Sequence, residues 1–131
     1  MLYVKTKIAP SKIAGIGLFA AEDIPKGALI WKLKPGFDIV MDKVKLKELS
    51  DSAKQQVLNY CYVNPKSKKI IICSDDARFI NHSKTPSALD VPTKDGLETE
   101  VFAAHNIKKG EEITEDYEIF DEHYRLKLNI S

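Results

Sequence analysis

Cysteine is scarce in this sequence, and the chain contains no long apolar run. Its two cysteines, Cys61 and Cys73, are too few for a disulfide framework or a zinc cluster, so we expect both to pack in the core. No apolar stretch approaches the roughly 18 residues that a membrane helix needs, and residues 1–10 lack the apolar segment of a signal peptide. These absences argue against a membrane protein and predict an intracellular, cytoplasmic one.

Charge is nearly balanced in total but not along the chain. The 131 residues are 44% hydrophobic and 30% charged, which is typical of one globular domain with a single core. Residues 1–72 carry 13 Lys and Arg against 6 Asp and Glu, whereas residues 73–131 carry 7 against 13. Direct nucleic-acid binding would need a concentrated basic face, for which the sequence gives little support. The acidic second part suits a basic ligand such as a lysine-rich peptide, although a solvated charged surface explains it equally well.

Hydrophobic periodicity predicts a mainly β chain with one helical region. Residues 42–60 place apolar side chains on approximately one helical face, and Ser50 or Asp51 can cap a second helix within this region. Short strands are expected at residues 2–8, 28–31, 69–73 and 97–104, and turns at residues 24–27, 64–67 and 93–96.

Gly15, Gly17 and Ala20 match the spacing of a dinucleotide-binding fingerprint. That fingerprint requires a helix of several turns to begin at the glycines and to present its N-terminus to a pyrophosphate. Pro25 and Gly27 interrupt such a helix almost at once, and no βαβ repeat follows. We therefore interpret the glycines as positions where the backbone is approached closely by another group.

One segment of the sequence occurs twice. Residues 19–30 align without a gap with residues 102–113, and both follow the frame F-A-A-x-x-I-x-K-G-x-x-I. Two copies are too few for a solenoid. They predict two similar β-turn-β units on either side of the helical region.

The least ordinary chemistry lies in residues 78–83, which read Arg-Phe-Ile-Asn-His-Ser. The apolar pair Phe79 and Ile80 runs into three polar side chains, and Pro86 follows, so we expect a strand to give way to a turn here. Taken alone, a solvated turn explains the segment better than a ligand site does. Tyr117, at the end of an acidic stretch, is likewise explained by ordinary packing when it is taken alone.

Three elements nevertheless occur in a definite order along the chain. They are Gly15-Ile16-Gly17, Arg78-Phe79-Ile80-Asn81-His82-Ser83, and Gly110-Glu111-Glu112-Ile113-Thr114-Glu115-Asp116-Tyr117. Together with the paired I-x-K-G turns, they resemble the SET-domain protein lysine methyltransferases over nearly the whole chain. The Asn-His-Ser element followed by Pro86 is the most specific part, and the G-E-E-I-T-x-D-Y element is nearly as specific.

The resemblance implies a SET-domain β-clip, which is a mainly β fold of short sheets with a short helical insert. In this fold the C-terminal segment threads beneath a loop as a pseudoknot, which would bring Asn81 and His82 beside Tyr117. Residues 1–131 would form a single SET domain. Its expected parts are an N-terminal β part (1–31), a helical insert (32–73) and a C-terminal β part with the motifs and a short lid (74–131).

The resemblance also implies S-adenosylmethionine as the cofactor on one face and a lysine-bearing protein or peptide on the opposite face. A narrow channel would join the two. By analogy, Tyr117 would be the catalytic residue, and the cofactor-binding residues would be Gly15, Ile16, Gly17, Asn81, His82 and Tyr117. The attacking lysine must be neutral, whereas its pKa in water is about 10.4, so a desolvated channel beside a cationic cofactor would help by lowering that pKa.

The sequence also departs from the family pattern. The zinc-binding segment that follows the domain in many members is missing, no metal is expected, and Phe120, His123 and Tyr124 are the candidates for a zinc-free lid. Tyr60, Tyr62, Glu115, Phe120 and Tyr124 are candidate walls of the substrate channel. Glu115 occupies a position that commonly carries an aromatic residue limiting how many methyl groups are added, so the degree of methylation is left open.

We therefore expect a minimal, stand-alone enzyme that methylates a lysine of a histone-like or other lysine-rich protein. The alternative is a SET-like module that holds cofactor or peptide without turnover, and a β-clip protein with no cofactor at all is a third possibility. Dimer formation is a candidate way to complete the missing lid, and the small size suggests a bacterial or viral origin.

Overall fold

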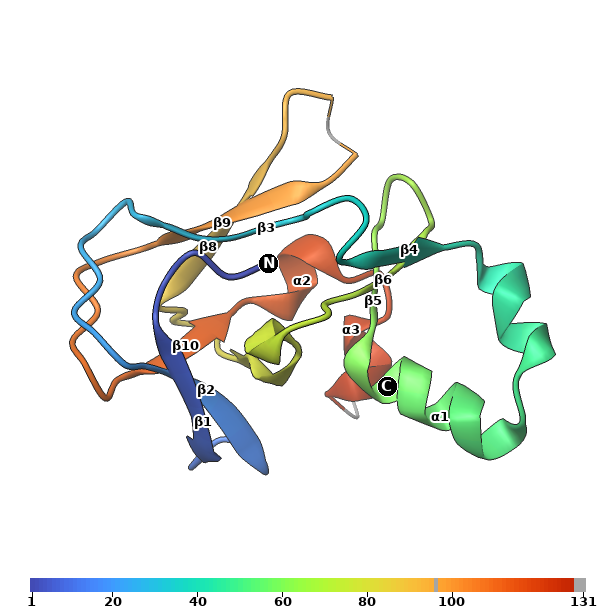
Figure 1. Cartoon of the computed structure of the whole chain (residues 1–131), viewed down its shortest axis with the longest axis horizontal. Helices are drawn as coiled ribbons and strands as arrows, with labels where there is room; N and C mark the ends of the chain where they lie inside the picture. Colours follow the sequence, from blue (N-terminus) through green and yellow to red (C-terminus); the bar gives the residue numbers. More distant parts are fainter. Residues whose placement is uncertain (96, 129–131) are drawn as a thin grey trace.

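The computed structural model describes residues 1–95 and 97–128, and within them the strands form three small sheets (Figure 1). The first sheet has the order β1 (Thr6–Pro10), β2 (Ile16–Ala20), β10 (Glu112–Glu115) and β7 (Asn81–His82). The second has the order β3 (Leu29–Lys32), β9 (Thr99–Ala103) and β8 (Ala88–Pro92). The third has the order β4 (Ile39–Met41), β6 (Ile70–Ile72) and β5 (Tyr62–Val63).

The helices are short and join these sheets. They are two 3₁₀ helices, η1 (Lys43–Glu48) and η2 (Asp76–Phe79), and the α-helices α1 (Asp51–Tyr60), α2 (Tyr117–Phe120) and α3 (Tyr124–Lys127). The helical region expected at residues 42–60 is confirmed. Ser50 caps α1, because its side chain accepts a hydrogen bond from the Ala53 N–H at 3.2 Å. The expected mainly β fold class is also confirmed.

Two local predictions were wrong. The first strand begins at Thr6 rather than Leu2, which forms only an isolated bridge to Trp31. Residues 78–83 are not a strand that gives way to a turn, because η2 comes first and β7 follows it. The reason is the Asp75 side chain, which accepts a hydrogen bond from the Ala77 N–H at 3.1 Å and caps η2.

The main core lies where the sheets meet. Leu18 of β2, Ile30 of β3, Ile71 of β6 and Ile113 of β10 are each 0% exposed and belong to one hydrophobic cluster. A second cluster of Cys61, Val63 and Ile70 holds the apolar side of α1, including Val57 and Leu58, against the third sheet. Both thiols are buried as expected, and burial raises the pKa of each, so neither cysteine is suited to act as a thiolate.

The repeated segment forms two β-turn-β units that pair with each other through equivalent hydrogen bonds. The Gly27 N–H donates to the Ala103 carbonyl at 2.9 Å, and the equivalent Gly110 N–H donates to the Ala20 carbonyl at 2.8 Å. Ile24 and Ile107 exchange both of their backbone hydrogen bonds, each at 2.8 Å. Gly27 and Gly110 have φ of 82° and 93°, which is why both turns carry glycine. The two copies are therefore related by an approximate two-fold arrangement in the fold.

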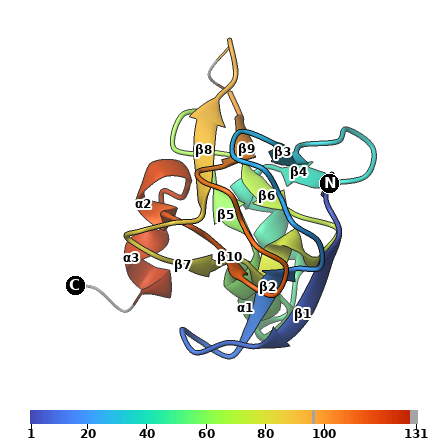
Figure 2. The same ribbon diagram turned by 90° about the vertical axis from the view of Figure 1, so that its left-hand side faces the viewer.

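The C-terminal segment reaches the first sheet from the far end of the sequence. β10 pairs in parallel with β7, with Thr114 opposite Asn81 and Glu115 opposite His82 (Figure 2). After α2, the Asp121 carboxylate accepts a hydrogen bond from the Val63 N–H of β5 at 3.1 Å. The segment thus lies against both β7 and β5, as the expected pseudoknot requires. In residues 1–95 and 97–128, no helix has the length and apolarity needed to cross a membrane.

Candidate functional site

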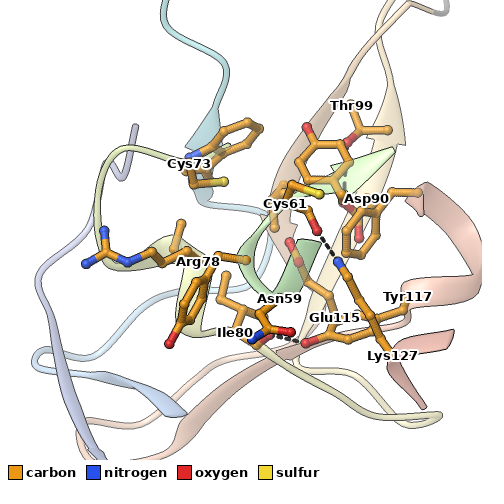
Figure 3. Close-up of a pocket in the computed structure, with 16 residues that line it drawn as sticks. Asn59, Cys61, Cys73, Arg78, Ile80, Asp90, Thr99, Glu115, Tyr117 and Lys127 are labelled. Atoms are coloured by element: carbon orange, nitrogen blue, oxygen red, sulfur yellow. Dashed lines mark hydrogen bonds between the residues drawn. The ribbon is translucent and has the colours of Figure 1, made fainter. Parts of the chain in front are cut away.

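Two cavities have Tyr117 in their walls. The large cavity has a volume of about 700 Å³, and the residues around it include Ile13, Ala14, Leu58, Asn81, His82 and His123. The small cavity has a volume of about 70 Å³ and is shown in Figure 3. Four residues line both cavities: Asn59, Cys61, Tyr117 and Lys127. These four residues therefore form the wall that the two cavities share.

Asn81 is held by the loop that contains the first glycines. Its side-chain amide donates to three acceptors, which are the carbonyls of Ala14 (3.0 Å) and Ile16 (3.3 Å) and the Glu112 carboxylate (3.0 Å). The residues of this loop that line the large cavity are Ile13 and Ala14, directly before Gly15-Ile16-Gly17. Asn81 therefore fixes the position of the loop against the large cavity.

Gly17 is a position of close approach. A Cβ atom at Gly17 would stand 2.1 Å from Glu112 Oε1, the same oxygen that accepts hydrogen bonds from Asn81 and from the Ser11 hydroxyl. Gly15 has φ of 45°, in the left-handed region. The two glycines thus let the half-buried Glu112 carboxylate tie the turn between β1 and β2 to β7.

His82 and Tyr117 contact each other directly. His82 Nδ1 accepts a hydrogen bond from the Tyr117 N–H at 3.1 Å, and the two rings lie 5.3 Å apart between centroids. The backbone of Tyr117 is also set by Asp116, whose side chain caps α2 by accepting from the Glu118 N–H at 3.1 Å. The expected juxtaposition of Asn81-His82 with Tyr117 is confirmed.

The Tyr117 hydroxyl points toward η2 and donates to the Ile80 carbonyl at 2.5 Å. Burial raises the pKa of Tyr117, and the Glu115 carboxylate raises it further, so the phenol stays protonated at neutral pH. Because the proton is directed at Ile80, the lone pairs of the hydroxyl oxygen are left for a ligand at the wall that the two cavities share.

The small cavity combines aromatic walls with carboxyl groups. Tyr60, Tyr62, Glu115 and Phe120, all expected as channel walls, line it together with Tyr117. Phe120 packs edge-on against both Tyr62 and Tyr117, with centroid distances of 5.2 Å and 5.7 Å. The Tyr62 hydroxyl donates a hydrogen bond to the Glu98 carboxylate at 2.5 Å. Its polar end is therefore occupied, and the ring contributes an apolar surface to the cavity.

Tyr124 does not take the place expected for it. It lines neither cavity, because its hydroxyl donates to Glu118 at 3.0 Å and its ring lies against the Arg125 guanidinium. The other two lid candidates do border the site, Phe120 at the small cavity and His123 at the large one. Within the described residues, no group of three or more His, Cys, Asp or Glu side chains is arranged to hold a metal ion.

Two residues at the site were not found from the sequence. Asp90, in β8, lines the small cavity, and Lys127, in α3, lines both cavities. The Lys127 ammonium donates to the Cys61 carbonyl, pairs with the buried Asp121 carboxylate at 2.7 Å, and lies 5.6 Å from the centre of the Tyr117 ring. Figure 3 shows Lys127 directed toward Cys61 beside Glu115.

A family model described as "SET domain" matches residues 15–118, which include all three sequence motifs. The chain belongs to the SET-domain family. This SET domain is 29% identical over 123 residues to a histone-lysine N-methyltransferase of Candida albicans described as H3 lysine-36 specific, and 30% identical over 123 residues to its Saccharomyces cerevisiae counterpart. The alignments cover 89% of this chain but 14% and 16% of those two proteins. The chain thus spans about one sixth or less of the length of these relatives.

Solved structures show the same fold. The Neurospora SET-domain protein DIM-5, a histone lysine methyltransferase, superposes with a TM-score of 0.61 at 19% identity, over 88% of this chain and 53% of that one. A Polycomb repressive complex 2 structure from Chaetomium thermophilum superposes with a TM-score of 0.65 at 18% identity, over 94% of this chain and 16% of that one. The expected β-clip fold is therefore confirmed.

Proposed function

We propose that this SET domain transfers methyl groups from S-adenosylmethionine to a lysine side chain of a protein. The observation that carries the proposal is the wall at Tyr117 that the large and the small cavity share, and we place the passage between the two substrates there. Methyl transfer needs a donor and an acceptor held on opposite sides of a narrow opening, because alignment of the two reacting atoms supplies much of the rate.

The large cavity fits the cofactor. Its volume of about 700 Å³ lies within the range of roughly 300–1,000 Å³ that is usual for small-molecule sites. Asn81, His82 and Tyr117 are assigned to holding the cofactor, and Gly15, Ile16 and Gly17 to shaping the loop beside it. When bound there, S-adenosylmethionine supplies a methyl group on a positively charged sulfur.

The small cavity fits the acceptor lysine. Aromatic side chains, among them Tyr62 and Phe120, offer apolar walls to an alkyl chain. The carboxyl groups of Asp90 and Glu115 offer acceptors to a terminal ammonium. Asp90 Oδ2 is buried and has no hydrogen-bond partner among the described residues, so an N–H donor from a ligand would satisfy it.

Tyr117 is assigned the catalytic position. Its hydroxyl is neutral and fixed by Ile80, and it stands in the passage that the two substrates must share. There its oxygen orients the reacting groups through weak C–H···O contacts and through hydrogen bonding to the amine. Its contribution is thus positioning and not acid–base chemistry.

A lysine-rich protein is proposed as the substrate, and the names of the yeast relatives make histone H3 the first to try. The acidic character of residues 73–131, which supply Asp90 and Glu115, favours a basic partner. We also propose that the protein acts inside the cell, where such a substrate is found.

The test is incubation of the purified protein with isotope-labelled S-adenosylmethionine and either histone H3 or a cell lysate, followed by mass spectrometry. We expect label on lysine side chains, and the spectra will give the target and the number of methyl groups together. Tyr117→Phe serves as the matched control. If the protein binds the cofactor but no lysine becomes labelled, the protein is a SET-like binding module without turnover and not an enzyme. Failure to bind the cofactor would leave a β-clip protein without this activity.

A further inference from the structure

The small cavity contains two carboxyl groups that nothing else in the protein neutralises fully. Glu115 ends β10 and Asp90 lies in β8, so they reach the cavity from different sheets, and Figure 3 shows both beside Tyr117 and Lys127. The Glu115 residue is 7% exposed, and within residues 1–95 and 97–128 its carboxylate makes no hydrogen bond. Asp90 accepts one hydrogen bond, from the Thr99 hydroxyl at 3.3 Å, and its other oxygen is buried and has no partner among the described residues.

A carboxylate with few hydrogen bonds in such a cavity is costly as an anion, so two of them together do not both stay ionised at neutral pH. We propose that Asp90 and Glu115 form a carboxyl pair that shares one proton and accepts a second from the ammonium of the target lysine. The inference rests on the proposed function, because it assigns the base that makes the acceptor lysine neutral.

The surroundings of Asp90 and Glu115 favour a pair that holds one proton and one negative charge. Burial raises the pKa of Glu115 well above its ordinary value, and the Asp90 charge raises it further, while the Lys127 cation partly opposes the shift. Burial and the Glu98 carboxylate likewise raise the pKa of Asp90, to about 7. Three other titratable groups that line the cavity, Tyr62, Cys73 and Tyr117, are held neutral at pH 7 by their own raised pKa values, and the Arg78 cation lies in the same lining. The pair thus carries about one negative charge near neutral pH.

The proton step is simple to balance. A lysine enters the small cavity as an ammonium, one N–H proton moves to the ionised carboxylate of the pair, and a neutral amine and a second carboxylic acid result. The proton later returns to solvent from the pair. In water only about one lysine in 10³ is neutral at pH 7, given a pKa of about 10.4, so a base at this place raises the reactive fraction.

The first measurement needs no substrate and no methyl transfer. Carbon-13 NMR of the side-chain carboxyls should show Asp90 titrating near neutral pH in the wild-type protein. Asp90→Asn removes the neighbouring charge and should lower the Glu115 midpoint by one pH unit or more. Asp95→Asn, the same substitution at an exposed side chain that lines neither cavity, should leave that midpoint in place. Ordinary titration of both carboxyls near pH 4 in the wild-type protein would overturn the shared proton.

The second measurement is the pH profile of single-turnover methyl transfer to the lysine identified above. Asp90→Asn and Glu115→Gln should each slow transfer about tenfold or more at pH 7 and recover toward the wild-type rate near pH 9.5, where solvent deprotonates more of the lysine. An equal loss of the methyl-transfer rate at every pH would mean that the two side chains have only a structural role. That result would overturn their assignment as the base. If the wild-type protein methylates nothing while the carboxyls still titrate as expected, the proposed function fails and the shared proton stands.

Discussion

Three neighbours fix the position of Tyr117. His82 accepts from its N–H, the Ile80 carbonyl accepts from its hydroxyl, and Phe120 packs against its ring. A side chain held at its backbone, its ring and its polar end has little freedom left to lose in a reaction. This is the physical reason for assigning it to the passage between the cavities.

The substitution Tyr117→Phe tests that assignment. It removes the hydroxyl but keeps the ring that lines both cavities, so we expect the rate of methyl transfer to fall at least tenfold, or about 1.4 kcal/mol. The affinity for S-adenosylhomocysteine, measured by calorimetry, should stay nearly unchanged. Tyr124→Phe removes a hydroxyl from a tyrosine outside both cavities and is the control. Normal turnover in Tyr117→Phe would contradict the catalytic role assigned to Tyr117.

Asn81→Ala should weaken cofactor binding more than it slows methyl transfer. The substitution deletes the amide that holds the carbonyls of Ala14 and Ile16 and the Glu112 carboxylate, so the loop beside the large cavity loses its anchor. We expect the dissociation constant for S-adenosylhomocysteine to rise about tenfold, before any comparable change in the rate at saturating cofactor. Gln56→Ala, in the exposed part of α1, controls for the loss of a side-chain amide. An unchanged dissociation constant would contradict the assignment.

At the scale of elements, a buried ion pair ties α3 to the domain. The Asp121 carboxylate is buried, accepts from the N–H groups of Val63 and His123, and pairs with Lys127 at 2.7 Å. The Lys127 ammonium in turn reaches the Cys61 carbonyl at the start of β5. This contact holds α3 beside the wall that the two cavities share.

Lys127→Met measures this attachment. The methionine keeps most of the apolar stem but leaves the buried Asp121 charge without its cation, which should lower the free energy of unfolding by about 1–3 kcal/mol in urea denaturation. Lys43→Met removes a lysine from a longer ion pair with Glu122, at 3.8 Å, and should cost less than about 1 kcal/mol. Equal effects in the two variants would show that α3 is not held in this way.

The same elements show what the sequence could and could not predict. The motifs predicted that Asn81, His82 and Tyr117 would meet, and the helix cap at Ser50 was visible in the local sequence. Asp90 was missed because β8 inverts the usual pattern: Leu89 and Val91 are 44% and 45% exposed, and the aspartate between them lies on the side that lines the cavity. Lys127 was missed because its partner Asp121 and the Cys61 carbonyl are brought to it only by the path of the C-terminal segment.

At the scale of the whole molecule, the charge difference between the two parts of the sequence does not divide the molecule into two faces. The first sheet joins β1 and β2 from the basic part to β10 and β7 from the acidic part, and the second sheet joins β3 to β9 and β8. Basic and acidic segments are therefore interleaved. The acidic residues that line the small cavity are Asp90 and Glu115. Homodimer formation remains a prediction, and light scattering will test it.

Binding of a basic peptide should accordingly depend on salt, but only modestly. Mobile ions screen exposed charges over about 8 Å at physiological ionic strength, whereas a lysine inside the small cavity is shielded from them. We expect the KM for a lysine-rich peptide to rise several-fold between about 0.05 M and 0.3 M salt, while the KM for the cofactor changes less. A peptide shortened to the target lysine and its nearest neighbours should lose most of this dependence, because it keeps the cavity contacts and loses the exposed ones. A flat response for the long peptide would mean that the acidic segments take no part in recognition.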